Sequence, residues 1–369
     1  TLCIQAMLRL VAEEGDKVLF GRTIHRSAIN TAALLGIDPI YVMPRRNAGQ
    51  DLPGRIEAKD VEDVLISHDD VKAVYITSPD YFGVISDVAA ISSVCKKFSV
   101  PLIVDNAHGT HLKFLSADIH PITLGASLSA DSAHKTLPVF TGGALLQIAD
   151  EKYVSDSKDA MQLFASTSPS YPIMASLDVG LHWIEKFGRK AYGELAEKVS
   201  SIRSELSHIG VSLPEGVCDP IRLSINTASV GISGIDAAKY LRKNAFEPEY
   251  ANTNYIVLIL TPFVDDEQIA KLAYVLKLMI DKCFFQNLES KNRSRDFLFD
   301  LPKKIFTPRE ALFGKTYTIS IDEAYNKICA QVANVCPPGI PGVMPGELIT
   351  LDTIKILKES GFRKIKIIV

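Results

Sequence analysis

Short apolar runs alternate with amphipathic stretches along the first half of the chain. The apolar runs predict buried strands at residues 17–20, 71–77 and 101–105. Between them, apolar residues recur at helical spacing around residues 25–35, 59–67 and 85–98. This alternation predicts an α/β fold with a mostly parallel sheet covered by helices on both faces. Functional groups of such sheets gather at the carboxyl ends of the strands, where Asp105 and the turn at 77–79 are expected.

The second half of the chain carries a different pattern. A long helical pattern runs from about 170 to 190, and a small α+β region is then predicted from strands at 221–225 and 255–260 and helices at 234–244 and 265–281. We therefore expect a large domain over residues 1–185 and a smaller C-terminal α+β region over 186–369. A charged linker is expected near 285–305, and Pro/Gly-rich turns near 337–342 and 345–347.

Composition and charge then narrow the class of protein. The chain has 369 residues, of which 47% are hydrophobic, and a formal net charge of −3. Without basic clusters we expect no nucleic-acid partner and no membrane partner, and no apolar run reaches the ~20 residues that span a bilayer. The six cysteines lack C-x-x-C spacing, which favours free thiols over disulfides or a metal site. These features predict a cytoplasmic enzyme.

Two short motifs carry candidate chemistry. In the first, Asp105 closes an apolar run and His108 follows three residues later, a pattern that alone is more typical of a turn or a cap. In the second, Lys135 ends the run Ser132-Ala133-His134-Lys135 among small and apolar neighbours, whereas a single lysine is usually a solvated charge. Apolar surroundings lower the pKa of an amine and favour its neutral, nucleophilic form.

Taken together, the two motifs fit pyridoxal phosphate. This cofactor needs a lysine that carries it as a Schiff base and a carboxylate that keeps its ring nitrogen protonated, so that the ring accepts electrons. Lys135 and Asp105 supply these groups. The phosphate needs hydroxyls and backbone amides, and Ser132 supplies one hydroxyl. We therefore predict pyridoxal 5'-phosphate as the cofactor.

Further motifs extend the pattern along nearly the whole chain. They are Ile24-His25-Arg26-Ser27, Asp105-Asn106-Ala107-His108-Gly109, Ser132-Ala133-His134-Lys135-Thr136, Ser166-Thr167-Ser168-Pro169, Pro308-Arg309-Glu310-Ala311 and Pro337-Pro338-Gly339-Ile340-Pro341 with Pro345-Gly346-Glu347. With these motifs the chain resembles the fold-type-I decarboxylases of ornithine, lysine and arginine. The last two motifs distinguish this family from aminotransferases and oxoamine synthases, which share the Asp, His and Lys residues. The resemblance is to a short form without an N-terminal wing domain. The chain opens on Thr1 inside a helical pattern, so we expect an N-terminal segment to be missing.

The resemblance implies a role for the residues around the cofactor ring. Lys135 would bind the cofactor covalently, and Asp105 would pair with its ring nitrogen. His108 would lie near the phenolic oxygen and the reacting carbon. His25 would stack on the ring, although a surface histidine at a helix start would otherwise be the favoured interpretation of this residue.

The resemblance also implies which residues reach the phosphate. Ser132 and His134 would contact it, together with Thr1 if that residue belongs to the phosphate loop. Ser166 would contact a phosphate in the opposite subunit, because active sites in this family form at a dimer interface. The alternative for Ser166 is a cap of the helix that follows.

Substrate selection is expected to involve the C-terminal tail. In the family, acidic groups of this region lie near the distal cationic end of the substrate, so Glu347 is the candidate, with an exposed turn residue as the alternative. Two positions depart from the family pattern: Asn106 replaces the usual Glu, and Asp80 stands where Thr is usual. Neither departure affects the lysine or the ring-nitrogen acid, but both weaken the transfer of substrate preference.

The expected function is decarboxylation of a basic amino acid, with arginine or lysine slightly favoured over ornithine. The expected partners are the small basic substrate and a second copy of the chain, in a homodimer or higher homo-oligomer with shared sites. One alternative is another reaction of the same scaffold, such as transamination or oxoamine synthesis. The other is a catalytically silent paralogue with a binding or regulatory role, which would bind no cofactor visible by its absorbance.

Overall fold

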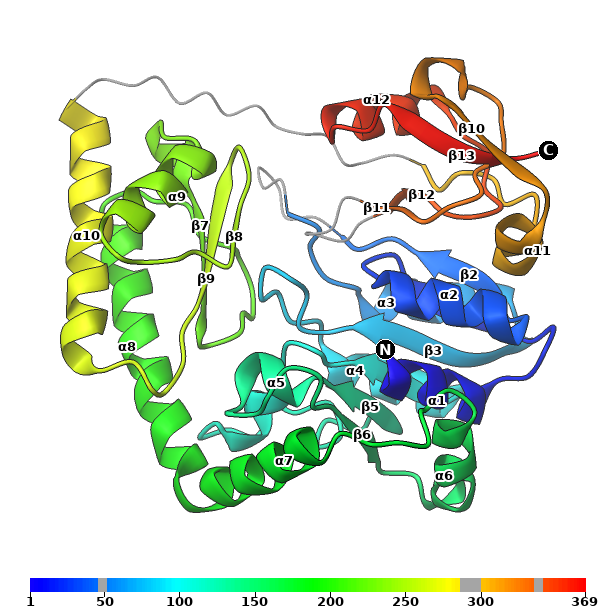
Figure 1. Ribbon diagram of the computed structural model, residues 1–369, viewed down its shortest axis with the longest axis horizontal. Helices are drawn as coiled ribbons and strands as arrows, with labels where there is room; N and C mark the ends of the chain where they lie inside the picture. The colour runs from blue at the N-terminus through cyan, green and yellow to red at the C-terminus, as the bar shows by residue number, and fades with distance from the viewer. Residues whose placement is uncertain (46–51, 286–299, 335–340) are drawn as a thin grey trace.

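A six-stranded sheet lies at the centre of the computed structural model, which describes residues 1–45, 52–285, 300–334 and 341–369. The strand order is β2-β1-β3-β4-β5-β6 (Figure 1). Neighbouring strands run parallel from β2 to β5, and β6 is antiparallel to β5. The strands are β1 (Lys17–Gly21), β2 (Asp38–Val42), β3 (Val71–Thr77), β4 (Leu102–Asp105), β5 (Leu128–Asp131) and β6 (Leu145–Ile148).

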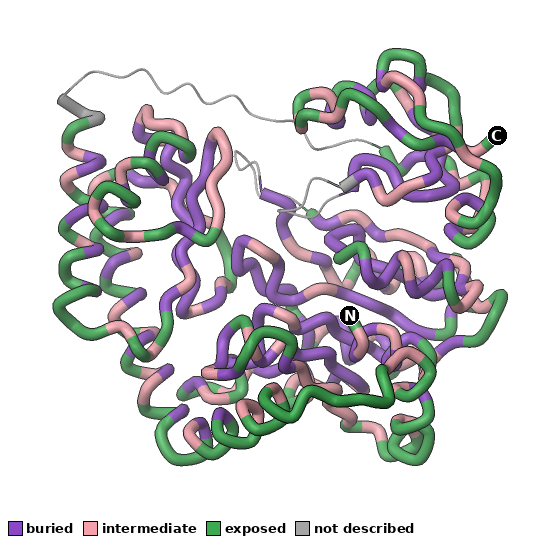
Figure 2. Tube along the Cα trace, in the orientation of Figure 1, coloured by how far each residue is buried: buried purple, intermediate pink, exposed green. Residues whose placement is uncertain are grey.

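Helices cover both faces of this sheet. The covering helices are α1 (Leu2–Val11), α2 (Arg26–Leu35), α3 (Ala58–Ser67) and α4 (Val88–Lys97). Along β1, Phe20 packs in one core with α1 and α2, whereas Leu19 packs in the other with α3 and α4. Successive side chains of a strand point to opposite faces, so a strand buried on both sides reads as a continuous apolar run. The predicted α/β fold is confirmed, and Figure 2 shows the buried strands between the helical layers.

A long helical run leads from this sheet to a second unit. It comprises α7 (Tyr171–Trp183), a π-helical turn (Ile184–Gly188) and α8 (Arg189–His208). The second unit has an antiparallel sheet of order β7-β9-β8 and two further helices. Its elements are β7 (Arg222–Asn226), α9 (Gly234–Lys243), β8 (Tyr250–Ala251), β9 (Tyr255–Ile259) and α10 (Asp266–Phe285). Its core is continuous with Ala133 and Leu137, which lie in and beside the short helix α5 (Ala133–Thr136).

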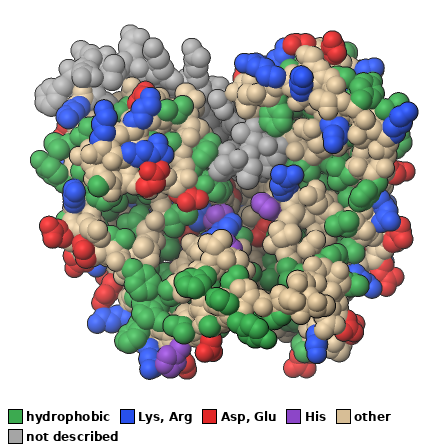
Figure 3. Space-filling model, viewed as in Figure 1, with side chains coloured by type: hydrophobic (Ala, Val, Ile, Leu, Met, Phe, Trp, Pro, Cys, Tyr) green, Lys and Arg blue, Asp and Glu red, His purple; other side chains and the backbone are tan. Residues whose placement is uncertain are grey.

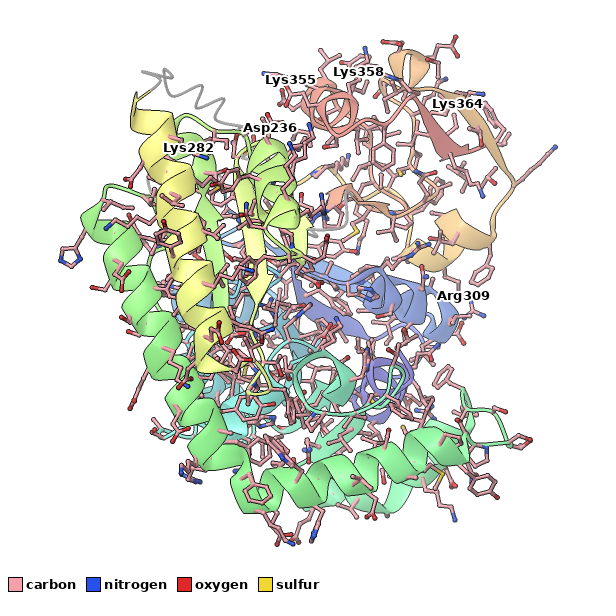
Figure 4. The ribbon with its side chains drawn as sticks, turned by 60° about the vertical axis from the view of Figure 1, so that its left-hand side comes forward. Asp236, Lys282, Arg309, Lys355, Lys358 and Lys364 are labelled. Carbon is pink, nitrogen blue, oxygen red and sulfur yellow. The ribbon has the colours of Figure 1, made fainter. Side chains whose placement is uncertain are left out.

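A third unit follows at the C-terminal end and lies beside α2 and β2 (Figure 1). It contains the antiparallel pairs β10–β13 and β11–β12, with a core of its own. Its elements are α11 (Pro308–Phe313), β10 (Thr316–Ser320), β11 (Ala333–Asn334), β12 (Pro341–Val343), α12 (Leu351–Glu359) and β13 (Lys364–Ile368). Arg309 of α11 donates to the carbonyl of Leu34 in α2 at 3.0 Å, and Figure 4 shows it on the side facing α2.

Shorter elements complete the described chain. They are the 3-10 turns η1 (Thr110–Phe114), η2 (Glu151–Tyr153), η4 (Thr227–Val230) and η5 (Ile321–Glu323), and the helix α6 (Val154–Gln162). Within the described ranges, no helix is both long and apolar enough to cross a membrane.

The predicted strands and helices are confirmed, with ends that differ by a few residues. Three strands of the central sheet, β2, β5 and β6, were not predicted. The predicted linker at 285–305 and the turn at 337–342 lie largely outside the described residues. The predicted boundary after residue 185 falls inside the π-helical turn and stays a prediction.

Candidate active site

Asp105 is the last residue of β4, and its carboxylate is buried at the carboxyl edge of the sheet. In the strand register it lies between Thr77 of β3 and Ala130 of β5. Its Oδ2 accepts a hydrogen bond from the Tyr75 hydroxyl at 3.0 Å, and its Oδ1 accepts one from the Ala107 N–H at 3.2 Å. Burial and the Asp105 charge hold the pKa of Tyr75 well above its usual value, so this hydroxyl remains a donor. Both donors are neutral, and a protonated ring nitrogen would be a stronger partner for the carboxylate.

His108 follows Asp105 in the turn before η1 and lies between two basic side chains. Its Nε2 is 3.2 Å from Nζ of Lys135, and its Nδ1 is 3.0 Å from Nη2 of Arg222. The ring of Tyr81 meets it edge-on, with the ring centroids 5.5 Å apart. Burial first, and then the positive charge of Arg222, hold the pKa of His108 well below its usual value, so the imidazole is neutral near pH 7.

Lys135 is in α5, directly after β5, so the strand order brings it to the same edge of the sheet as Asp105. Its backbone N–H donates to the carbonyl of Ser132, the residue that caps α5, at 3.0 Å. The side chain is exposed in this chain. The expectation that Lys135 is embedded among small and apolar neighbours is therefore wrong. One group in contact with the amine is the polar ring of His108.

His25 is the N-cap residue of α2, and its Nδ1 accepts the backbone N–H of Ser27 at 3.2 Å. The alternative of an exposed histidine at a helix start is therefore what this chain shows. Partial desolvation of the ring lowers the pKa of His25, the charge of Asp105 opposes this effect, and a protonated Lys135 would add to it. His25 thus lies near both residues, and stacking on a cofactor ring stays a prediction.

The predicted phosphate residues Ser132 and His134 flank α5. Ser132 is the N-cap residue, but its hydroxyl makes no capping hydrogen bond to the helix. Nδ1 of His134 is 2.8 Å from the carbonyl oxygen of Gly143, which only accepts, so this nitrogen carries the hydrogen. Nε2 of a neutral His134 then has a lone pair, and the ring would donate to a phosphate only when protonated.

Thr1 and Ser166 are both exposed. Thr1 is the N-cap residue of α1. Ser166 lies in the exposed segment before α7, where its hydroxyl accepts the N–H of Ser168 at 3.1 Å. The residue that caps α7 is Ser170, so the alternative of a helix cap at Ser166 is wrong. The phosphate roles of both residues stay predictions.

Glu347 is buried at 1% exposure, so the alternative of an exposed turn residue is wrong. Its two carboxylate oxygens accept from Nη1 and Nη2 of Arg22 at 2.6 and 2.8 Å. Oε2 also accepts the backbone N–H of Met344 at 2.7 Å. These contacts place Glu347 between the C-terminal unit and the residue that follows β1. They offer no support for the predicted contact with substrate, which stays untested.

Arg222 is a site residue that the sequence analysis missed. It is the first residue of β7, is 1% exposed, and donates through Nη1 to the carbonyls of Asp80 and Tyr81 at 3.2 and 2.7 Å. Asp219 lies on its other side, with Oδ2 3.6 Å from Nε of Arg222 and Oδ1 2.8 Å from Nε2 of His111. The available signal was a charged residue within a predicted strand whose other residues, apart from Ser224, are apolar; such a charge needs buried partners.

The departure at Asn106 has a physical explanation in the carboxylate that it meets. Nδ2 of Asn106 donates to Oδ1 of Asp131 at 2.9 Å, and a glutamate at this position could not donate. The same carboxylate accepts from the hydroxyl of Ser129 at 2.6 Å and from Nε2 of His120 at 2.8 Å. This buried network holds the ends of β4 and β5 together, and these ends carry Asp105 and Lys135.

The donor set at this edge fits pyridoxal phosphate. Asp105 offers a buried carboxylate, Lys135 an amine that reaches His108, and His108 a neutral ring. Figure 3 shows histidine, basic and acidic side chains gathered near the centre of the face in view, where the surface is hollowed. A parallel sheet with these groups at its carboxyl edge defines a fold-type-I enzyme of the pyridoxal-phosphate class.

Comparisons with known proteins agree with this class. The sequence matches the major domain of the Orn/Lys/Arg decarboxylases over residues 1–216 and their C-terminal domain over residues 292–359. The chain therefore belongs to the Orn/Lys/Arg decarboxylase family, and it is an amino-acid decarboxylase of the pyridoxal-phosphate class.

Individual relatives cover nearly the whole chain. The arginine decarboxylases of Bacillus subtilis and Bacillus anthracis are 28% and 27% identical to it, over 96% and 97% of this chain and 75% of each relative. The lysine decarboxylase of Francisella novicida has a similar fold, with a TM-score of 0.80 and 19% identity over 100% of this chain and 68% of that protein.

Proposed function

We propose that this protein decarboxylates a basic amino acid, arginine or lysine in preference to ornithine, with pyridoxal phosphate bound to Lys135. The observation that carries the proposal is the contact of Lys135 Nζ with His108 Nε2 at 3.2 Å, at the sheet edge where Asp105 ends β4. Arginine decarboxylases and lysine decarboxylases among the relatives support a basic substrate.

Different residues of this chain would contact different parts of the cofactor. Asp105 would hold the proton on the ring nitrogen, because its buried carboxylate has only neutral donors in the contacts described above. His25, Ser132 and His134 would contact the ring and the phosphate. When bound, pyridoxal phosphate supplies an electron sink for the electrons released as the carboxylate leaves.

The protein must also return a proton to the α-carbon after carbon dioxide leaves. Nζ of Lys135 and Nε2 of His108 are the two groups that we propose for this step, because they lie together at the edge of the sheet. Their pre-set positions lower the cost of ordering donor and acceptor during the reaction.

The substrate's distal cation requires a carboxylate within reach of His108. Glu249 meets this need better than Glu347, because its Oε1 accepts from the hydroxyl of Tyr81, at 3.1 Å, and the Tyr81 ring contacts His108. Glu249 is also exposed, so its carboxylate is accessible to a ligand, whereas Glu347 is bound to Arg22. The predicted selectivity role is therefore proposed for Glu249.

We further propose that the active unit is a homodimer. Large apolar side chains are exposed on α7 and the segments next to it: Phe140, Leu163, Tyr171, Met174 and Val179. Apolar patches of this kind mark protein interfaces. The segment also contains Ser166, which a dimer of this arrangement would carry toward the partner's phosphate site.

A product assay tests the proposed reaction. The purified protein with added pyridoxal phosphate is incubated separately with arginine, lysine and ornithine, and the products are identified by mass spectrometry. We expect agmatine or a diamine together with carbon dioxide, and we expect Lys135→Ala to lower kcat by at least about 10³-fold, because the residue acts as the nucleophile.

A matched control is Lys152→Ala, which removes an exposed lysine distant from α5 in sequence and leaves the site intact. A keto acid product from the unmodified protein would contradict decarboxylation. Full activity in Lys135→Ala would show that a different residue binds the cofactor.

A further inference from the structure

Arg222 joins the two sides of the site, because it reaches from β7 of the second unit to His108 beside the central sheet. Three acceptors contact its guanidinium: the backbone carbonyls of Asp80 and Tyr81, and Nδ1 of His108 at 3.0 Å. The carboxylate of Asp219 lies 3.6 Å away as an ion-pair partner. A guanidinium is always protonated and only donates hydrogen bonds. The contact with His108 therefore determines which atom of the imidazole carries a hydrogen.

The tautomer of His108 follows from this contact. Because Nη2 of Arg222 donates, Nδ1 of His108 must accept through its lone pair. A neutral imidazole with a lone pair on Nδ1 has its hydrogen on Nε2. That hydrogen faces Nζ of Lys135 at 3.2 Å, so the amine accepts it through the lone pair of its neutral form.

A charged Lys135 does not fit the same contact. An ammonium group has donors only, and it would face the N–H of His108 with no acceptor between the two nitrogens. The amine is exposed, so desolvation among apolar residues does not account for a neutral form. The hydrogen bonds run in one direction instead, from Arg222 to His108 and from His108 to Lys135.

We propose that Arg222 is a positioning residue that holds His108 in the Nε2–H tautomer and thereby keeps Lys135 as a neutral amine. The proposal rests on the proposed function only for the identity of Lys135 as the cofactor-binding residue. A neutral amine has the lone pair that a nucleophile needs, so the arrangement prepares Lys135 without burying it.

The charges around His108 act in the same direction. Burial and the charge of Arg222 on β7 oppose a positive charge on the ring. Lys135 on α5, His25 at the start of α2 and His111 on η1 are the other titratable groups near it, and in the proposed neutral form Lys135 adds no charge. Asp219 carries the balancing negative charge, and it contacts Arg222 and His111 rather than His108. The backbone carbonyl of Asp80 accepts a hydrogen bond from Arg222, whereas its side chain accepts one from the N–H of Val84.

The tautomer is directly measurable by ¹⁵N NMR of the full chain with ¹⁵N-labelled histidine. His108→Gln identifies the signals of His108 by their loss. At about pH 7 we expect Nε2 to show the shift of a protonated nitrogen and Nδ1 that of an unprotonated one, with no protonation of the ring as the pH falls toward 6. A hydrogen on Nδ1, or on both nitrogens, would overturn the proposal.

Variants of Arg222 test the cause. In Arg222→Met we expect the His108 ring to titrate nearer its usual pKa and to lose its single tautomer, whereas Arg222→Lys keeps a donor and retains the tautomer in part. The control is Arg203→Met, whose guanidinium also lies in this region but donates to the carbonyls of Asp219 and Arg222. It should leave the His108 signals unchanged.

A second readout uses the visible absorbance of the holoenzyme as a function of pH. Loss of the Arg222 charge should raise the pH of the absorbance transition by about one unit or more. This shift corresponds to a proton affinity of the Lys135 nitrogen that is at least about tenfold higher. No shift in Arg222→Met, or an equal shift in Arg203→Met, would overturn the proposal. If Arg222→Met does not fold, the ¹⁵N NMR spectrum of the unmodified protein decides whether His108 has the proposed tautomer. If the unmodified protein has the expected ¹⁵N NMR spectrum but no decarboxylase activity, the proposed reaction is refuted and the proposed role of Arg222 is not.

Discussion

Asp80 is a buried carboxylate in the loop after β3, at a position where the family usually has Thr. It is 3% exposed, and its Oδ1 accepts the backbone N–H of Val84 at 2.8 Å. Its Oδ2 has no hydrogen-bond partner among the described residues. Burial raises the pKa of Asp80 to about 7, against the opposing effects of the Val84 N–H and of the charge on Arg222. The carboxyl group is therefore partly protonated at neutral pH.

This raised pKa predicts how stability depends on pH. Between about pH 4 and 7 the folded chain holds a proton on Asp80 that the unfolded chain has released, so the free energy of unfolding falls as the pH rises. Asp80→Asn removes this titration and keeps an acceptor for Val84. Relative to the unmodified protein, we expect the variant to become more stable as the pH rises from 4 to 7. The difference in the free energy of unfolding should level off above pH 7, at roughly 4 kcal/mol.

Urea unfolding at a series of pH values measures this effect. Asp69→Asn is a matched control, because Asp69 is exposed. The control should differ from the unmodified protein by less than about 0.5 kcal/mol at every pH. A gain for Asp80→Asn that does not depend on pH would contradict the titration of Asp80.

At the scale of elements, the position of Lys135 depends on a helix that is too short to be stable in isolation. Helix α5 has four residues, fewer than an isolated helix needs. Tyr192 of α8 donates its hydroxyl to the carbonyl of Thr136, the last residue of α5, and packs its ring near that of His111, with 5.7 Å between the ring centroids. Helix α8 thus supports the segment that carries Lys135.

Tyr192→Phe tests this support with a minimal change. The hydroxyl is lost, so the buried carbonyl of Thr136 loses its donor, and we expect the free energy of unfolding to fall by about 1–3 kcal/mol. Affinity for pyridoxal phosphate, measured by titration of visible absorbance, should fall as well. Tyr274→Phe on α10, where the tyrosine is 62% exposed, is the control and should change neither quantity. Equal effects in both variants would rule out a specific role for Tyr192.

Elements also show how far periodicity predicts this sheet. The strands β1, β3 and β4 were predicted because they are apolar on both faces, as central parallel strands require. The strands β2 and β6 lie at the two edges of the sheet, and β5 alternates polar and apolar residues in Leu-Ser-Ala-Asp. Such short segments have no clear strand signal, because pairing with neighbours decides their conformation.

At the scale of the whole molecule, one buried ion pair joins the two ends of the chain. Arg22 and Glu347 are 325 residues apart and are bound through two hydrogen bonds, while the guanidinium of Arg22 also lies over the ring of Tyr41 at 4.7 Å. Loss of one partner leaves the other as an unpaired charge in the interior, which costs far more than a surface ion pair. The pair therefore holds the C-terminal unit against the central sheet.

Glu347→Gln separates this structural role from the predicted role in substrate binding. We expect the free energy of unfolding to fall by about 3–5 kcal/mol, because Arg22 keeps its charge without a counter-charge. Under conditions where the variant is still folded, its KM for arginine and lysine should stay unchanged. Glu247→Gln is the control, since it removes an exposed partner of Arg242, and it should cost less than about 1 kcal/mol. Normal stability with a raised KM would restore the substrate role of Glu347.

The candidate site divides into a part that local sequence predicts and a part that it does not. Asp105 and His108 are three residues apart at the end of one strand, so the chain itself keeps them close. Lys135 follows β5, a strand that the sequence did not predict, and the alignment of parallel strands at their carboxyl ends brings it to the same edge. Arg222 is 114 residues from His108, and no local pattern relates the two.

The sequence by itself determined the α/β class, because periodicity along the backbone is a local property. It also predicted the edge of the sheet that carries the chemistry and the residues Asp105, His108 and Lys135, from their motifs and from the resemblance to the decarboxylases. Only the tertiary structure decided that Lys135 is exposed, that Arg222 binds His108 and that Glu347 pairs with Arg22. These contacts depend on which segments pack together, because a buried charge takes its partner from whatever part of the chain folding brings beside it.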